Sequence, residues 1–187
     1  MKHALSHSRI SQRPSEGFTL LETLVAVFIF SLALVSLVVI SSRGIIVTTT
    51  AKNRSIAQFL AQEGIELVEH QRDSNFLNPS GSWLDGFDNC QTSLNPSGCQ
   101  VDAISSTYTL DFRPCSGDCQ LLNVTSNGIY GYGVGETTPF RRTLYIDSGM
   151  FTGSSVGDSS LVRSVVSWRQ GGAVYSVESQ KYLTNWF

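Results

Sequence analysis

The sequence predicts an α+β fold in which one long N-terminal helix packs on a small C-terminal antiparallel β-sheet. The chain has no proline from Phe18 to Arg72, and apolar residues recur at helical spacing in the later part of this stretch. Beyond residue 72, turn sequences separate short stretches in which apolar and polar residues alternate. The last two of these stretches flank Gln170-Gly171-Gly172, a sequence typical of a tight hairpin turn. A helix followed by strands of this kind favours a helix that covers one face of a sheet.

The N-terminal part consists of a polar leader and an apolar segment. Residues 1–17 show no periodicity, and we expect them to form a flexible leader. Residues 23–42 are twenty consecutive positions without a charge, which is enough for a helix to cross a bilayer once. The sequence therefore predicts a transmembrane segment at about residues 20–42. A cleaved secretory signal would have a shorter apolar core and a small-residue cleavage site, which Ser41-Ser42-Arg43-Gly44 matches poorly.

The helix continues beyond the apolar segment as an amphipathic one. Residues between Ile56 and Val68 recur at helical spacing and form a broad apolar face beside glutamine and glutamate residues. We expect one helix over residues 18–72, about 55 residues or ~80 Å long. Gly44 and the threonines at 48–50 lower the helix propensity, so a bend or a melted turn is expected near residues 42–50. The apolar face is expected to pack on the chain's own C-terminal domain and to leave surface for copies or partner helices.

Residues 73–187 are expected to form a β-rich head domain. Turn signals recur in it, and the sequence NPSG occurs twice, at 78–81 and 95–98. Alternating stretches predict strands at 108–112, 140–146, 161–168 and 173–183. We expect Trp168 and Trp186 to pack in the core of this domain.

The four cysteines, Cys90, Cys99, Cys115 and Cys119, all lie in the head region in turn-rich sequence. An even number of cysteines in such sequence indicates disulfides and an oxidising compartment. Pairing of near neighbours would close two small loops, but three connectivities are open. A zinc site is disfavoured because the C-x8-C and C-x3-C spacings are loose and no histidine is near.

The sequence argues against catalytic, cofactor-binding and nucleic-acid-binding roles. Two of its three histidines lie in the leader, and His70 has no accompanying nucleophile motif. The calcium-loop and phosphate-loop spacings are both missing, so no metal or cofactor is expected. From Asp73 onward the chain has ten acidic and six basic residues, which provides no basic surface for nucleic acid.

Glu22 lies at the start of the apolar segment, where a carboxylate costs a few kcal/mol unless it is shallow or paired. It follows Gly17 and Phe18 in the sequence GFTLLE, after a polar basic leader and before an apolar helix. This order of features resembles the cleavage and methylation site of type IV prepilins and type II secretion pseudopilins. The resemblance covers residues 1 to about 45. The rest of the chain resembles these pilin-like proteins only in its general arrangement, a helix that leads into a small antiparallel sheet.

The resemblance implies a role for each residue of the motif. Prepilin peptidase would cut after Gly17 on the cytoplasmic side of the membrane, and the new N-terminal amine of Phe18 would be methylated. Glu22 would neutralise the amine of an adjoining subunit during assembly, which gives a buried carboxylate the partner it needs. Glu16, directly before the scissile glycine, departs from this pattern and is expected to slow processing.

The resulting prediction is a minor pilin-like structural subunit of a type IV pilus, most similar to PilV-type minor pilins. Its partners would be other pilin subunits through the N-terminal helix, prepilin peptidase and the cytoplasmic membrane. The head would lie outside the cytoplasm on a single-pass anchor, and on the cell surface after assembly. Two alternatives stay open: a secretion pseudopilin or DNA-uptake pilin, and a membrane-anchored binding protein or adhesin that does not polymerise.

Overall fold

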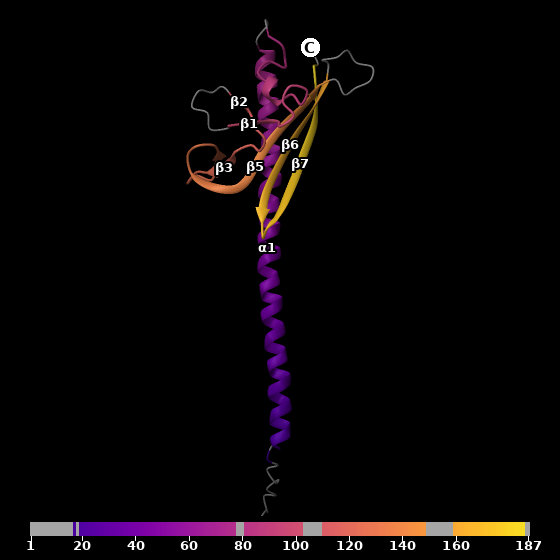
Figure 1. The fold of residues 1–187 in the computed structure, drawn as a ribbon, viewed down its shortest axis with the longest axis vertical. Coiled ribbons are helices and arrows are strands. Elements are labelled where there is room, and N and C mark those ends of the chain that lie inside the picture. The colour runs from indigo at the N-terminus through magenta and orange to yellow at the C-terminus, as the bar shows by residue number, and fades with distance from the viewer. Residues whose placement is uncertain (1–16, 18, 78–80, 103–109, 149–158, 186–187) are drawn as a thin grey trace, which may run out of the picture. The chain divides into compact units, whose positions relative to one another are not determined.

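The computed structural model describes residues 17, 19–77, 81–102, 110–148 and 159–185. The chain divides into two compact units, Met1–Val47 and Thr48–Phe187, and each is described by itself. Helix α1, Leu20–Phe76, is continuous in sequence through both (Figure 1). It ends four residues later than expected. Residues 42–50 are helical, so the expected melted turn is wrong. The local cost of one glycine and three threonines is too small to interrupt a helix with turns on both sides.

In the part of the chain that the structure describes, seven strands and one short 3₁₀ helix follow α1. They are η1 (Asp88–Cys90), β1 (Cys99–Val101), β2 (Phe112–Pro114), β3 (Leu121–Val124), β4 (Tyr130–Gly131), β5 (Glu136–Ser148), β6 (Ser159–Gln170) and β7 (Ala173–Thr184). All pairings between these strands are antiparallel. The expected α+β fold, with a helix packed on an antiparallel sheet, is confirmed.

Strand β5 is the centre of the sheet. One side of it pairs with β6 from Phe140 to Ser148, and the other side pairs with β1 and β3. Strand β7 pairs with β6 over its full length and forms an outer edge (Figure 1). The predicted strands at 140–146, 161–168 and 173–183 are therefore confirmed as β5, β6 and β7. The strand predicted at 108–112 is present only as β2, which begins at Phe112, and Tyr108 lies outside the described residues.

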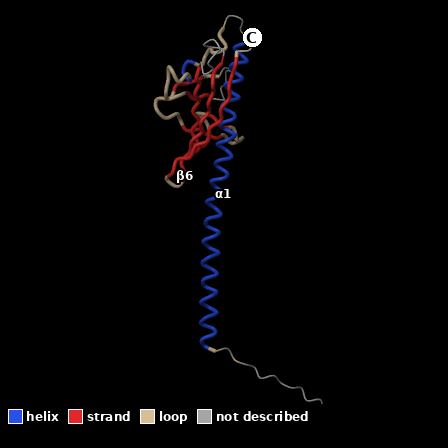
Figure 2. The backbone as a smooth tube through the Cα atoms, turned by 90° about the vertical axis from the view of Figure 1, so that its right-hand side faces the viewer, coloured by secondary structure: helices blue, strands red, loops and turns tan. Residues whose placement is uncertain are grey.

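The sheet lies along one side of the later half of α1 (Figure 2). The helix buries one stripe of small and aliphatic residues against the strands, namely Ala57, Leu60, Ala61, Gly64, Ile65 and Val68. Gly64 marks the closest approach, because a Cβ there would lie 2.4 Å from Ser164 Oγ and 3.0 Å from Leu144 Cδ2. The helix can approach the sheet this closely only because residue 64 has no side chain.

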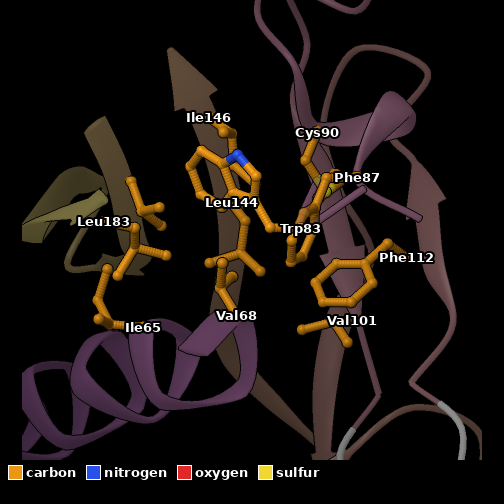
Figure 3. Close-up of a cluster of buried hydrophobic side chains, with 12 residues drawn as sticks. Ile65, Val68, Trp83, Phe87, Cys90, Val101, Phe112, Leu144, Ile146 and Leu183 are labelled. Atoms are coloured by element: carbon orange, nitrogen blue, oxygen red, sulfur yellow. A yellow bond between two sulfur atoms is a disulfide. The ribbon is translucent and has the colours of Figure 1, made fainter. Parts of the chain in front are cut away.

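The core has two parts. The first, here called the Val68 cluster, contains Ile65, Val68, Trp83, Phe87, Cys90, Cys99, Val101, Phe112, Leu144, Ile146, Val162 and Leu183. In Figure 3, Ile65 and Val68 extend from the helix toward Leu144 and Leu183 on the strands. The second, here called the Trp168 cluster, contains Ala57, Leu60, Ala61, Leu122, Phe140, Val166 and Trp168. The expected core packing of Trp168 is confirmed, and Trp186 lies outside the described residues.

Candidate functional site

The candidate site is the start of α1, where Thr19 caps the helix. The Thr19 hydroxyl accepts a hydrogen bond from the backbone N–H of Glu22 at 3.2 Å, and the Thr19 carbonyl accepts one from Thr23. Thr19-x-x-Glu22 has the spacing of a capping box, in which the acid is also favoured by the positive end of the helix dipole. Sequence reasoning missed this cap, although the spacing is visible in the sequence.

Gly17, the residue before the expected cleavage, is exposed. A Cβ built on it would meet no atom within 4 Å, and its φ is not in the left-handed region. The fold therefore does not require glycine at this position. Phe18, the expected site of N-methylation, lies outside the described residues.

The hydroxyl groups of the apolar segment are mostly satisfied by their own helix. Thr23, Ser31, Ser36 and Ser42 each donate to a backbone carbonyl three or four residues earlier, at 2.8–3.1 Å. Such bonds allow a hydroxyl to enter an apolar environment at little cost. These side chains need no partner from another chain.

Glu22 differs from these hydroxyls. Its side chain is exposed and has no hydrogen bond or ion pair to any residue that the structure describes. A carboxylate cannot use the carbonyls of its own helix, because when ionised it has only acceptors. Within the described part of the chain, Glu22 is an ionisable group at the start of an apolar helix without a counter-charge.

The surface that follows Glu22 is apolar and uncovered. Every residue from Thr19 to Thr49 is exposed in its own unit, including all the large apolar side chains between Leu20 and Val47. By length and composition, this is the one helix among the described residues that could cross a membrane. The run extends beyond the expected span, because Ile45, Ile46 and Val47 follow Arg43 and are exposed too. A soluble monomer would not leave so much contiguous apolar surface open to water.

The head holds its own polar site, which sequence reasoning missed. Arg142 on β5 is fully buried between the helix and the sheet. Its guanidinium donates to Glu63 Oε2 at 3.0 Å, to the Leu60 carbonyl at 3.3 Å and to the Val101 carbonyl at 3.1 Å. These contacts connect the helix to β1 and β5. Strand alternation is the signal that could have found it, because Arg142 falls on the same face of β5 as Phe140, Leu144 and Ile146. The neighbouring Arg141 faces the other side of the sheet and pairs with Asp118.

Tyr132 lies close to this buried arginine. Its hydroxyl is buried and has no hydrogen-bond partner in the described residues. Burial raises the pKa of Tyr132 to about 12, an effect that the positive charge of Arg142 partly opposes. The phenol is therefore neutral at any physiological pH, and it is a packed side chain rather than an acid or a base.

The cysteines form two disulfides, Cys90–Cys99 and Cys115–Cys119. The first is fully buried in the Val68 cluster, and the second closes a loop between β2 and β3. Among the described residues, no three His, Cys, Asp or Glu side chains come together in a way that could hold a metal ion. His70 is exposed on α1.

One family model matches the chain. It describes the prokaryotic N-terminal methylation motif and covers residues 12–41, which include Gly17, Phe18 and Glu22. No curated protein and no solved structure gives a match. The motif and the apolar helix indicate membrane anchoring, and the motif implies processing by prepilin peptidase and assembly with other pilins. The sequence motif and the fold together support a type IV pilin-like protein, a structural subunit rather than an enzyme.

Proposed function

We propose that the protein is a minor pilin-like structural subunit of a type IV pilus, inserted as a single-pass membrane protein with its head outside the cytoplasm. Prepilin peptidase cuts after Gly17, and the new amine of Phe18 is methylated. The mature subunit then leaves the bilayer and enters the filament through α1. The observation that carries the proposal is an apolar helix surface that begins at Glu22 and that the described chain leaves uncovered.

The proposal explains three features that the fold leaves without a purpose. The peptidase requires glycine at position 17, whereas the fold does not, because a Cβ there would meet no neighbouring atom. Glu22 obtains a counter-charge from the amine of an adjoining subunit, in a setting where an unpaired charge would be costly. Phe59, 69% exposed on the otherwise polar side of α1, becomes a contact for a neighbouring subunit.

Substitution of Glu22 tests the assembly step. Glu22→Gln keeps the shape of the side chain and removes its charge, so membrane insertion and the folded head are retained. Loss of a buried charge pair costs about 3–5 kcal/mol, so we expect at least a tenfold fall in the amount found in sheared surface filaments. Ser36→Ala is the matched control, because Ser36 is polar, lies in the same segment and is satisfied by its own helix. Normal incorporation of Glu22→Gln into filaments would refute the proposed role of Glu22 in assembly.

The same fractionation distinguishes the related roles. A pilus subunit appears in filaments sheared from the cell surface, whereas a secretion pseudopilin stays in the envelope. A binding protein that does not polymerise would be absent from filaments whether or not Glu22 is changed. The minor rather than major role is tested by stoichiometry, because a minor subunit is expected at a small fraction of the main filament protein.

A further inference from the structure

A cavity of about 570 Å³ lies on the head, on the face of the sheet that points away from α1. Phe140 and Trp168 face the helix in the Trp168 cluster, so the alternate residues Arg141, Ser167 and Arg169 face the opposite side. The cavity is formed by three parts of the head: the Cys115–Cys119 loop with its neighbour Leu121, strands β5 and β6, and the start of β7. Its lining is Asp118, Leu121, Pro139, Arg141, Ser167, Trp168, Arg169 and Val174.

The cavity has an excess of positive charge. Arg141 Nη1 lies 2.6 Å from Asp118 Oδ2, in the loop that the second disulfide closes. Arg169 is exposed, and its side chain has no hydrogen bond or ion pair within the described residues. Arg141 pairs with Ser167 in the ladder, so Arg169 is its diagonal neighbour, at about 7–8 Å between Cα atoms. Two guanidinium groups with one carboxylate favour a ligand that carries a further carboxylate.

The rest of the lining is aliphatic. Leu121 on β3 and Val174 on β7 are exposed at 38% and 65%, and Pro139 is on β5, which lies between those two strands in the sheet. Trp168 also borders the cavity, but it is buried, because its ring packs with Phe140 and stacks on the partly exposed Tyr175. An aliphatic wall without an open aromatic face fits the side chains of a peptide better than the flat face of a sugar.

The edge of the sheet next to the cavity is unpaired. Among the described strands, β7 pairs only with β6, so the backbone groups along its other edge have no strand partner. Val174 belongs both to this edge strand and to the cavity wall. An extended peptide could add to β7 by backbone hydrogen bonds and place alternate side chains over the face that carries the arginines.

We propose that the head binds an extended acidic peptide, whose backbone pairs with β7 and whose Glu side chain reaches across Val174 to Arg169 at the rim of the cavity, with Arg141 beyond it. This inference does not depend on processing at Gly17 or on filament assembly. It also gives the second disulfide a role, because that bond closes the loop from which Asp118 contacts Arg141.

Binding to the full chain in lipid nanodiscs tests the proposal. The probe is a short peptide of alternating valine and threonine with one central glutamate, and a peptide with glutamine at that position is the matched control. We expect the glutamate peptide to bind about tenfold more tightly, with an affinity that falls as salt is added. Arg169→Gln should abolish this preference. Arg163→Gln should preserve it, because Arg163 lies on the same face of β6 but is already paired with Asp147.

Two further probes separate the parts of the proposal. A glutamate peptide with N-methylated backbone amides cannot pair with β7 and should bind at least about tenfold more weakly. Glucuronate carries the same charge on a sugar and should not displace the peptide. Equal binding of the glutamate and glutamine peptides, or an unchanged preference in Arg169→Gln, would overturn the charge site. Undiminished binding of the N-methylated peptide, or displacement by glucuronate, would overturn the assignment to an extended peptide.

Discussion

Replacing Arg142 with alanine should strongly destabilise the head. The guanidinium is fully buried and joins Glu63 on the helix to the Val101 carbonyl on β1. Removal of one member of a buried pair typically costs about 3–5 kcal/mol, and here it also leaves a cavity. Glu63 is one-third exposed and can regain water, and the Leu60 carbonyl lies within the helix, so the lower half of that range is expected. A loss of about 3–4 kcal/mol corresponds to a fall in Tm of roughly 10 °C for a chain of this size.

The assay is thermal unfolding of the full chain in detergent, followed by near-ultraviolet circular dichroism. This signal reports the aromatic core of the head, whereas the far-ultraviolet signal would be dominated by α1. Arg142→Met is the control, because it fills most of the volume without a buried charge and should cost clearly less. A Tm within 3 °C of the wild type for Arg142→Ala, or an equal loss for Arg142→Met, would refute the role given to the hydrogen bonds.

Four other changes test the packing of the head. Gly64→Leu should lower the free energy of unfolding by about 3 kcal/mol in denaturant unfolding, at the upper end of the usual cost of overpacking, because its side chain has no room beside Ser164 and Leu144. A loss below about 1 kcal/mol would show that the helix can move off the sheet. Replacing Cys90 and Cys99 with alanine should lower the free energy of unfolding by about 2.6 kcal/mol from loop entropy alone, and by more because the bond is in the core. Removing the Cys115–Cys119 disulfide, which closes a shorter loop, should lower it by about 2 kcal/mol in the same assay. Tyr132→Phe should be neutral or stabilising at pH 7, since the hydroxyl has no partner in the described residues. The folded-state pKa of Tyr132 is about 12, above the usual value near 10. The stability linked to this group is therefore present below pH 10 and is lost as the pH rises from about 10 to 12 in the wild type, but not in Tyr132→Phe. An identical pH dependence of the two proteins would contradict this.

The elements with a strong local pattern were predictable from the sequence. The long helix, strands β5 to β7 and the hairpin at Gly171-Gly172 each have a periodicity or a turn signal of their own. Strands β1, β3 and β4 have two to four residues, which is too short for a periodic pattern. β1 and β3 form because β5 offers each of them an edge, and β4 forms on β3. That information comes from residues far away in the chain.

The functional residues also divide into those that the sequence shows directly and those that only the fold brings together. Gly17, Phe18 and Glu22 are visible in the sequence because they form a contiguous motif with a fixed order. The face of Arg142 follows from strand alternation, but its contacts with Glu63 and Val101 depend on how the helix and β1 pack on β5. The clustering of Arg141 with Arg169 depends on the register between β5 and β6, which the sequence does not display. The sequence could not select one of the three possible cysteine pairings for the same reason. Cys90 and Cys99 meet only when η1 and β1 pack in one core.

The N-terminus of the mature protein tests the central claim most directly. The protein is extracted from the membrane of cells with an active prepilin peptidase, and its N-terminal peptide is sequenced by tandem mass spectrometry. We expect a chain that begins at Phe18 with an N-methylated amine. Gly17→Leu, which should leave the fold unchanged because a Cβ at this position meets no neighbouring atom, is expected to block the cleavage. A wild-type protein that keeps Met1 and the whole leader would contradict the pilin assignment.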